Sequence, residues 1–355
     1  MQYKDFAIIL TWPDATIRGD EQWMMFFKKI GLVKNLNFKV GHTGIIIVKH
    51  DTGDMYFYDF GRYIAPRGYG RARSKFSDPL LEIKVKAKVN GNEIENLQEI
   101  SEHLETLKSA MYGEGKLFFS IVPNINFDIA KKYGDECVFQ GTYPYGAVAR
   151  NNNNCSRFIT RMLMKASPDF GFWHGINLPE TIKSSPVSNL VNSRRDRMIY
   201  SYTPEEGLKK FRMNRFQSFW FLVKQLGDNV KQHKADLLPT DRIIGAVDYN
   251  SKPISIPKHA TYLGGVGDGA WYAATYEADQ ECFIVKRFTT SGLLEYVVRG
   301  AVPEGFKPNE PFSVTYDSHL LFTHIQQNNT KLRIEHLEQL STEEHRYEHI
   351  KELYA

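Results

Sequence analysis

The feature that most constrains the fold of this chain is a change of sequence texture after about residue 205. Before that point, short apolar runs typical of strands alternate with stretches of helical apolar spacing, as at 94–107. After residue 242, short β-like runs follow one another and are separated by Gly, Asn and Asp turns. The pattern predicts an α+β protein in which a mixed domain precedes a mainly antiparallel β domain.

The domain boundaries follow from this change of texture. We expect a mixed domain over 1–203, a helical linker over 204–241, and an antiparallel β domain over 242–355 that ends in a helical tail. The linker is expected to be helical because the sequence TPEE at its start has the pattern of a capped helix start. A chain of 355 residues is long enough for two domains of ordinary size.

Local signals predict several elements of the mixed domain. The runs at 41–50 and 55–63 are expected to form two strands that a hairpin turn at 51–54 connects. The alternating sequence at 79–89 is expected to be a further strand. A short helix in the sequence NFDIAKKYG is expected to stop at Gly134.

The composition excludes several classes of function. Hydrophobic residues make up 42% and charged residues 24% of the chain, and the net charge of +4 is too small to predict nucleic-acid binding. Cys137, Cys155 and Cys282 are far apart and form no CxxC pair, so we expect no disulfide framework, no metal and no cofactor. The apolar run at 6–10 is too short for a signal peptide or a membrane span, which predicts a cytoplasmic protein without an integral membrane segment.

One of the three cysteines stands at the start of a predicted helix. The stretch NNNNCSRFITRML places Cys155 directly after Asn154, and asparagine is a preferred N-cap residue. If Asn154 caps the helix, the sulfur lies among unpaired backbone N–H groups at the positive end of the helix dipole. That environment favours the thiolate, which is the nucleophilic form of cysteine. The alternative is that Cys155 is a small buried residue without a chemical role.

Helical spacing predicts which way this cysteine points. Four apolar residues share its face of the helix: Phe158, Ile159, Met162 and Leu163. We therefore expect the face that carries the sulfur of Cys155 to pack on the body of the protein. Arg157 and Arg161 lie on a different face and are expected to be in solvent.

A thiolate nucleophile needs a base, and His42 fits that role best among the eleven histidines. It opens the strand-like sequence HTGIIIVKH, where neighbouring glycines leave room for a second element to approach the imidazole. His50 ends the same strand beside the turn, where a surface position is the better interpretation. The sequence therefore indicates a Cys–His pair.

The group that orients this base is expected on the partner strand of the hairpin. Pairing across the turn at 51–54 puts Asp59 on the face of His42 but opposite Ile46, four residues along from the histidine. Tyr63 lies directly opposite His42 in that register. A twist or a bulge could bring the carboxylate closer. Asp59 is the preferred third member and Tyr63 is its rival.

These residues together resemble a known pattern. GHTGIIIV early in the chain, a polar residue on the next strand and NNCSRFITRML later resemble the circularly permuted branch of the papain-like NlpC superfamily. That branch includes YiiX-like bacterial proteins and lecithin:retinol acyltransferase-like enzymes, and its histidine strand precedes its cysteine helix. LPETIKSSPVSNL is also similar to a proline-rich segment of YiiX-like proteins. The resemblance implies a permuted papain-like fold over roughly the first 200 residues.

The resemblance implies a cysteine hydrolase or acyltransferase that acts on a peptide amide or an acyl lipid. Cys155 matches the nucleophile of the family, His42 matches its base, and Asp59 most nearly matches its third member. The alternative is an inactive papain-like protein that binds a partner or serves as a scaffold. Trp271, Tyr272 and Tyr276, which lie near glycines in the β domain, favour that alternative unless they are strand core. The sequence leaves the substrate and the oligomeric state open.

Overall fold

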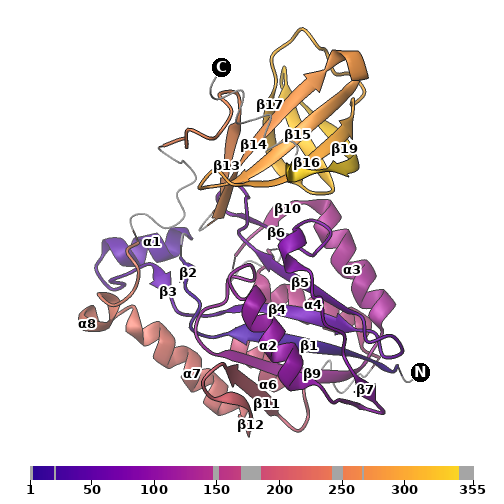
Figure 1. Cartoon of the computed structure of the whole chain (residues 1–355). Coiled ribbons are helices and arrows are strands. Elements are labelled where there is room, and N and C mark those ends of the chain that lie inside the picture. Colours follow the sequence, from indigo (N-terminus) through magenta and orange to yellow (C-terminus); the bar gives the residue numbers. More distant parts are fainter. Residues whose placement is uncertain are drawn as a thin grey trace. The chain divides into compact units, whose positions relative to one another are not determined.

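The protein consists of two compact units, which we describe separately (Figure 1). The computed structural model describes residues 3–19, 21–146, 152–168, 185–241, 251–265 and 268–343. Unit 1 consists of Met1–Gly61, Ala72–Lys75 and Pro79–Ile244. Unit 2 consists of Arg62–Arg71, Phe76–Asp78 and Gly245–Ala355. The first half of the chain therefore supplies two short segments, 62–71 and 76–78, to unit 2. The predicted boundaries placed both segments in the mixed domain.

Unit 1 is built on an eight-stranded sheet with the order β10-β6-β5-β4-β1-β9-β11-β12. Its strands are β1 (Asp5–Trp12), β4 (His42–Val48), β5 (Met55–Gly61), β6 (Tyr69–Arg73), β9 (Leu117–Ile125), β10 (Thr142–Pro144), β11 (Met198–Thr203) and β12 (Gly207–Arg212). Two smaller pairs are β2 (Ile17–Arg18) with β3 (Asn37–Phe38), and β7 (Val89–Asn90) with β8 (Glu93–Ile94). The central pairs β1–β4, β1–β9 and β4–β5 are antiparallel.

Helices cover both faces of this sheet, so unit 1 has three layers (Figure 1). The helices are α1 (Gln22–Lys29), α2 (Leu97–Leu107), α3 (Phe127–Gln140), α4 (Cys155–Ala166), α6 (Pro186–Asn192), α7 (Arg215–Asp228) and α8 (Gln232–Ala235), with the 3-10 helix η1 (Pro79–Leu81). Successive strand residues point to opposite faces. In β1, Ile8 and Leu10 pack in one core with Ile100 of α2. Thr11 points the other way and donates a hydrogen bond to the carbonyl of Pro186 in α6 at 3.2 Å.

Two local predictions for unit 1 were wrong. Helix α3 does not stop at Gly134, because the glycine is there for packing: a Cβ at that position would come within 2.6 Å of the Tyr58 ring. The helix ends at Gly141, whose φ of 81° suits glycine. The sequence at 79–89 forms η1 and irregular backbone before β7, rather than a strand.

The segment 204–241 also differs from the expected helical linker, since it forms part of unit 1. The hydroxyl of Thr203 does accept a hydrogen bond from the backbone N–H of Glu206 at 3.2 Å. That bond closes a turn, in which Gly207 has a φ of 66°, and β12 then pairs antiparallel with β11. A threonine hydroxyl accepts a hydrogen bond from the N–H three residues later both in a turn and at a helix start. The sequence TPEE therefore fits either structure, and the prediction chose the helix. The capped helix in this segment is α7.

Unit 2 is a seven-stranded antiparallel sheet with the order β13-β14-β15-β16-β19-β18-β17. Its strands are β13 (Thr261–Gly265), β14 (Asp268–Glu277), β15 (Cys282–Thr289), β16 (Leu294–Ala301), β17 (Ser313–His319), β18 (Phe322–Gln327) and β19 (Thr330–Leu340), with the 3-10 helix η2 (Ala278–Gln280). The sheet curls, because β17 also contacts β13 and β14. The hydroxyl of Tyr272 donates to the carbonyl of Ser318 at 2.9 Å. The predicted helical tail after residue 343 lies outside the described residues.

The core of unit 2 contains the aromatic residues that were considered as a binding surface. Trp271 and Tyr272 are both buried, so they are strand core and form no exposed patch. Ile64, from a short segment supplied by the first half of the chain, lies in the same hydrophobic cluster as Tyr272. The β domain is therefore completed by residues far from it in sequence.

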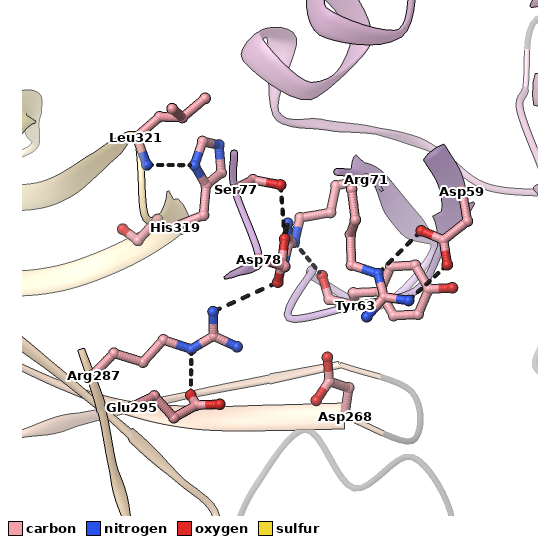
Figure 2. Close-up of polar contacts among 12 residues, drawn as sticks. Asp59, Tyr63, Arg71, Ser77, Asp78, Asp268, Arg287, Glu295, His319 and Leu321 are labelled. Atoms are coloured by element: carbon pink, nitrogen blue, oxygen red, sulfur yellow. Dashed lines mark hydrogen bonds and ion pairs between the residues drawn. The ribbon is translucent and has the colours of Figure 1, made fainter. Parts of the chain in front are cut away.

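The short segments also build a buried ionic cluster in unit 2 (Figure 2). The guanidinium of Arg71 donates two hydrogen bonds to the carboxylate of Asp78, at 2.9 and 2.8 Å. Arg287 of β15 lies 3.6 Å from Asp78 and forms a second ion pair with Glu295 of β16 at 2.8 Å. Removing one partner of such a pair leaves a buried charge uncompensated, which costs about 3–5 kcal/mol.

Candidate active site

Cys155 begins helix α4, as the sequence predicts. The side chain of Asn154 accepts a hydrogen bond from the backbone N–H of Arg157 at 2.9 Å, and this bond caps the helix. Two further hydrogen bonds hold Asn154 in place. The backbone N–H of Asn154 donates to Oδ1 of Asn153 at 3.1 Å, and its side-chain amide donates to the carbonyl of Gly146 at 3.3 Å. The predicted cap and the place of the cysteine in the first helical turn are confirmed.

The predicted inward face of α4 is also confirmed. Its four apolar residues are fully buried: Phe158, Ile159, Met162 and Leu163. Cys155 shares this burial, with 4% of its surface exposed. Arg157, expected in solvent, is buried as well, because its guanidinium donates to the carbonyl of Asn152 at 3.3 Å. Arg161 reaches the same carbonyl at 3.4 Å. Both arginines thus tie the helix to the asparagine run before it.

The register of the β4–β5 hairpin decides which residue lies near His42. The loop closes at Gly53, which has a φ of 69° and donates its N–H to the carbonyl of Lys49 at 2.9 Å. The strands then pair with Gly44 opposite Asp59. The expected register, which put Asp59 opposite Ile46, was wrong by two residues. The loop occupies 50–53 rather than the predicted 51–54, because the N–H of Lys49 donates to the carbonyl of Asp54. Asp59 is therefore a diagonal neighbour of His42.

His42, Asp59 and Arg73 form a buried polar series across the neighbouring strands β4, β5 and β6. Nε2 of His42 lies 3.1 Å from Oδ2 of Asp59. The guanidinium of Arg73 donates to Oδ2 at 2.6 Å and to Oδ1 at 3.1 Å. Two parallel bonds from one guanidinium fix the plane of a carboxylate. The carboxylate in turn fixes one nitrogen of the imidazole.

The charges of this series determine its protonation. Burial alone would raise the pKa of Asp59, because a carboxylate loses its hydration. The charge of Arg73 and the hydrogen bonds from His42 and Arg73 outweigh burial and lower that pKa to about 2. Asp59 is therefore an anion throughout the neutral range and can stabilise a positively charged imidazole.

The imidazole contacts the cysteine as well as the carboxylate. Burial alone would lower the pKa of His42, but hydrogen bonds to Asp59 and Cys155, with the negative charges of both groups, raise it to about 9. The sulfur of Cys155 thus lies within hydrogen-bonding reach of the ring. Because Asp59 occupies Nε2, Nδ1 is the ring nitrogen that remains for the sulfur.

Tyr63, the rival third member, has a different place in the structure. It belongs to a segment of unit 2, and its backbone carbonyl accepts a hydrogen bond from Nε of Arg71 at 3.1 Å. The hydrogen-bonded carboxylate beside His42 is that of Asp59. The structure thus brings Cys155, His42 and Asp59 together, while their catalytic roles stay predictions.

Two residues of this site were not found from the sequence. Arg73 lies in the sequence YGRAR of strand β6, where two arginines stand two residues apart. Arginines in a buried strand need carboxylate partners, and this pattern could have indicated the contact between Arg73 and Asp59. Asn189 of α6 donates to the carbonyl of Ser156 at 3.0 Å and accepts from Thr160 at 3.4 Å. It ties α6 to the first turn of the cysteine helix, and no local pattern indicates this long-range contact.

No group of three or more His, Cys, Asp or Glu side chains in the described residues is arranged to hold a metal ion. Within the same parts of the chain, no helix combines the length and the apolar character needed to cross a bilayer.

Comparisons with known proteins relate both units to protein families. Residues 260–337 match the DUF6695 C-terminal domain. The crystal structure of the type VI secretion system effector TseH has 17% sequence identity and a TM-score of 0.39, over 58% of this chain and 97% of that chain. No curated protein matches the sequence. Residues 7–172, which carry the candidate site, are similar to the family of type VI secretion system effectors described as TseH-like.

Proposed function

We propose that unit 1 is a thiol hydrolase or acyltransferase of the permuted papain-like type. Cys155 is the nucleophile, His42 is the general base, and Asp59 orients the base. The observation that carries the proposal is the contact series from a first-turn helical thiol to an imidazole that a carboxylate holds. Nucleophilic catalysis needs this arrangement, with the base within reach of the nucleophile and a third group fixing the base. The order of histidine strand and cysteine helix supports the permuted fold.

The first half of the reaction forms a thioester. The reactive state is an ion pair. His42, whose pKa is raised to about 9, carries at Nδ1 the proton that the Cys155 thiol has given up, and the carboxylate of Asp59 stabilises this imidazolium through Nε2–H. The thiolate attacks the carbonyl carbon of the substrate, a C–S bond forms, and the carbonyl π electrons move to oxygen. The imidazolium then protonates the leaving amine or alcohol as the C–N or C–O bond breaks.

The second half of the reaction releases the acyl group. A water molecule, or another acceptor, gives its proton to His42 and attacks the thioester carbonyl. The C–S bond breaks, and the thiolate of Cys155 remains beside the protonated His42, which restores the starting ion pair. Water as acceptor makes the protein a hydrolase, and an amine or an alcohol makes it an acyltransferase.

The N-terminus of α4 is the place where the negative oxygen of each intermediate would be stabilised. The first N–H groups of an α-helix have no acceptor within the helix. Asn154 accepts the hydrogen bond from Arg157. The backbone N–H of Cys155 itself is the donor that we assign to the oxyanion. The helix dipole adds to this effect because it favours negative charge at the same end.

The substrate class follows from the chemistry and from the family similarity. An amide bond of a peptide and an ester bond of an acyl lipid both present the carbonyl that the mechanism needs. The similarity to TseH-like effectors supports a secreted effector with hydrolase activity. The cytoplasmic location expected from the sequence stays a prediction, and secretion would place the substrate in another compartment.

The direct test uses the full-length protein, a thiol-reactive activity probe, and panels of peptide amides and acyl esters. Labelling at Cys155 and hydrolysis of at least one panel are expected, and Cys155→Ala and His42→Ala should each abolish hydrolysis. Cys137→Ala is the matched control and should retain full activity. Hydrolysis that survives Cys155→Ala would remove this proposal. A folded protein in which Cys155 is never labelled would favour an inactive binding protein instead.

A further inference from the structure

Helix α7 of unit 1 packs through one side and leaves large apolar side chains exposed on the other. Four large apolar residues lie on one side of the helix and are exposed: Phe216, Phe219, Trp220 and Leu226. The exposed fractions of Phe216 and Trp220 are 68% and 52%. The opposite side packs on the body of unit 1 through Ser218, which is buried, and Gln225, which donates to the carbonyl of Pro13 at 2.7 Å. We call the four exposed residues the α7 stripe.

A second helix of unit 1 has the same character. No residue of α1 is buried, and Trp23 and Phe26 have exposed fractions of 45% and 58%. The chain after α1 is bound to the end of α7, because the N–H of Lys34 donates to the carbonyl of Asn229 at 2.8 Å. Side-chain Nδ2 of Asn229 also donates to the carbonyl of Asn35 at 2.7 Å. Both helices lie at the periphery of unit 1, and α7 contacts α8 (Figure 1).

Such a concentration of exposed aromatic residues needs an apolar partner. Single exposed hydrophobic residues are ordinary, but a continuous stripe marks an interaction surface. A helix of 14 residues is about 21 Å long, which is too short to cross a bilayer. The partner therefore covers one side of the helix and does not surround it.

The charges around the stripe indicate what that partner is. From Lys209 to Lys234 inclusive, the sequence has seven Lys or Arg residues and one acidic residue. Two of these cations are paired, Lys209 with Glu206 at 2.9 Å and Lys234 with Asp228 at 2.6 Å. Lys224 follows Trp220 by one helical turn, so a cation lies along the edge of the stripe. Lysine is depleted in protein–protein interfaces, whereas aromatic residues with flanking Lys and Arg suit the surface of a membrane.

We propose that the α7 stripe and its flanking cations dock unit 1 on the surface of an anionic lipid bilayer. The helix lies in the plane of the membrane, with Phe216, Phe219 and Trp220 among the upper acyl chains. Lys224 at the edge of the stripe and Lys231, three residues after the end of α7, extend to the lipid phosphates, which long lysine side chains allow. This docking makes no assumption about the chemistry at Cys155, so it can succeed or fail independently of the proposed enzymatic function.

The test is sedimentation of the full-length protein with vesicles of phosphatidylcholine alone or mixed with phosphatidylglycerol. We expect binding to the anionic vesicles, weakening with salt. The double variant Phe216→Ser/Trp220→Ser and the charge reversal Lys224→Glu/Lys231→Glu should each weaken binding by about tenfold or more. Phe139→Ser is the matched control, because Phe139 of α3 has a similarly exposed ring at 56%, and it should bind like the wild type.

Two results would overturn the proposal. One is absence of wild-type binding to anionic vesicles, and the other is binding that the two α7 variants leave unchanged. Light scattering across a range of protein concentrations tests the rival occupant, a second copy of the chain. A dimer that Phe216→Ser/Trp220→Ser dissociates, together with no vesicle binding, would assign the stripe to self-association. Thiol labelling of each variant and its circular dichroism spectrum verify that unit 1 remains folded.

Discussion

Nε2 of His42 lies 3.1 Å from Oδ2 of Asp59, although the two residues are not directly opposite in the β4–β5 pairing. The contact is diagonal, and the guanidinium of Arg73 holds the carboxylate in the orientation that permits it. The imidazole is thereby fixed through one nitrogen while the other remains for the sulfur of Cys155.

Asp59→Asn should lower kcat by roughly 10²–10⁴, in analogy with the orienting carboxylate of serine triads. An amide presents no negative charge to the imidazolium, so proton transfer from the thiol becomes less favourable. Steady-state kinetics on the substrate found in the panels measures the loss. Tyr63→Phe should be mild, because Asp59 is the group bonded to His42. The opposite result, with an inactive tyrosine variant and a fully active asparagine variant, would transfer the role to Tyr63.

Cys155 should react with iodoacetamide at neutral pH faster than Cys137 or Cys282. Cys155 lies beside His42 and at a helix N-terminus, which are the surroundings of reactive cysteines, whereas burial raises the pKa of the Cys137 thiol. Mass spectrometry of partly alkylated protein ranks the three sites. Equal labelling of all three in the native protein contradicts an activated thiol, and denatured protein supplies the control in which the ranking should disappear.

The stability that the site contributes should depend on pH in a defined direction. The pKa of His42 is raised from 6.5 to about 9, so its contribution is complete below about pH 6.5 and is lost as pH rises through about 9. The pKa of Asp59 is lowered from 3.8 to about 2, so its contribution is complete above about pH 4 and is lost as pH falls through about 2.

Urea unfolding of the wild type and of His42→Ala measures this dependence. The difference in free energy of unfolding between the two should decrease by an amount on the order of 3 kcal/mol between pH 6 and strongly alkaline pH. A difference that stays constant over that range would show that the imidazole is not held in its charged form by Asp59 and Cys155.

Asn154→Ala should destabilise the protein by about 1 kcal/mol and also slow the alkylation of Cys155. The reason is that the side chain of Asn154 accepts the hydrogen bond that sets the first turn of α4. Ser185→Ala is the control, because Ser185 caps the neighbouring helix α6 in the same manner. It should cost similar stability while the alkylation rate stays at the wild-type value. Thermal unfolding and alkylation kinetics together separate the two effects.

Gly44→Ala should destabilise the protein by about 1–3 kcal/mol and lower activity. Gly44 is the residue paired with Asp59, and a Cβ at Gly44 would come within 2.3 Å of the Phe57 ring. Gly227→Ala in α7 is the control. Nothing lies within 4 Å of a Cβ there, and alanine favours a helix, so it should stabilise the protein by about 0.5–1 kcal/mol. Both values come from the midpoints of urea unfolding.

The sequence by itself determined the features that depend on neighbours along the chain. The cap of Asn154, the first-turn place of Cys155 and the buried side of α4 follow from local hydrogen bonding and from a period of 3.6 residues. The antiparallel β character after residue 260 follows in the same way from alternation and turn residues. A regular local pattern leaves few alternatives when its apolar side must be buried.

Tertiary structure alone decided the contacts between distant segments. The register of the β4–β5 hairpin depends on the loop that closes at Gly53, and a change of two residues moved Asp59 from a remote position to a diagonal neighbour of His42. Arg73 reaches Asp59 from a third strand, and the exposed side of α7 is apolar although spacing alone predicts that such a side is buried. These outcomes depend on which surfaces meet in the folded chain, and a local pattern of residues does not contain that information.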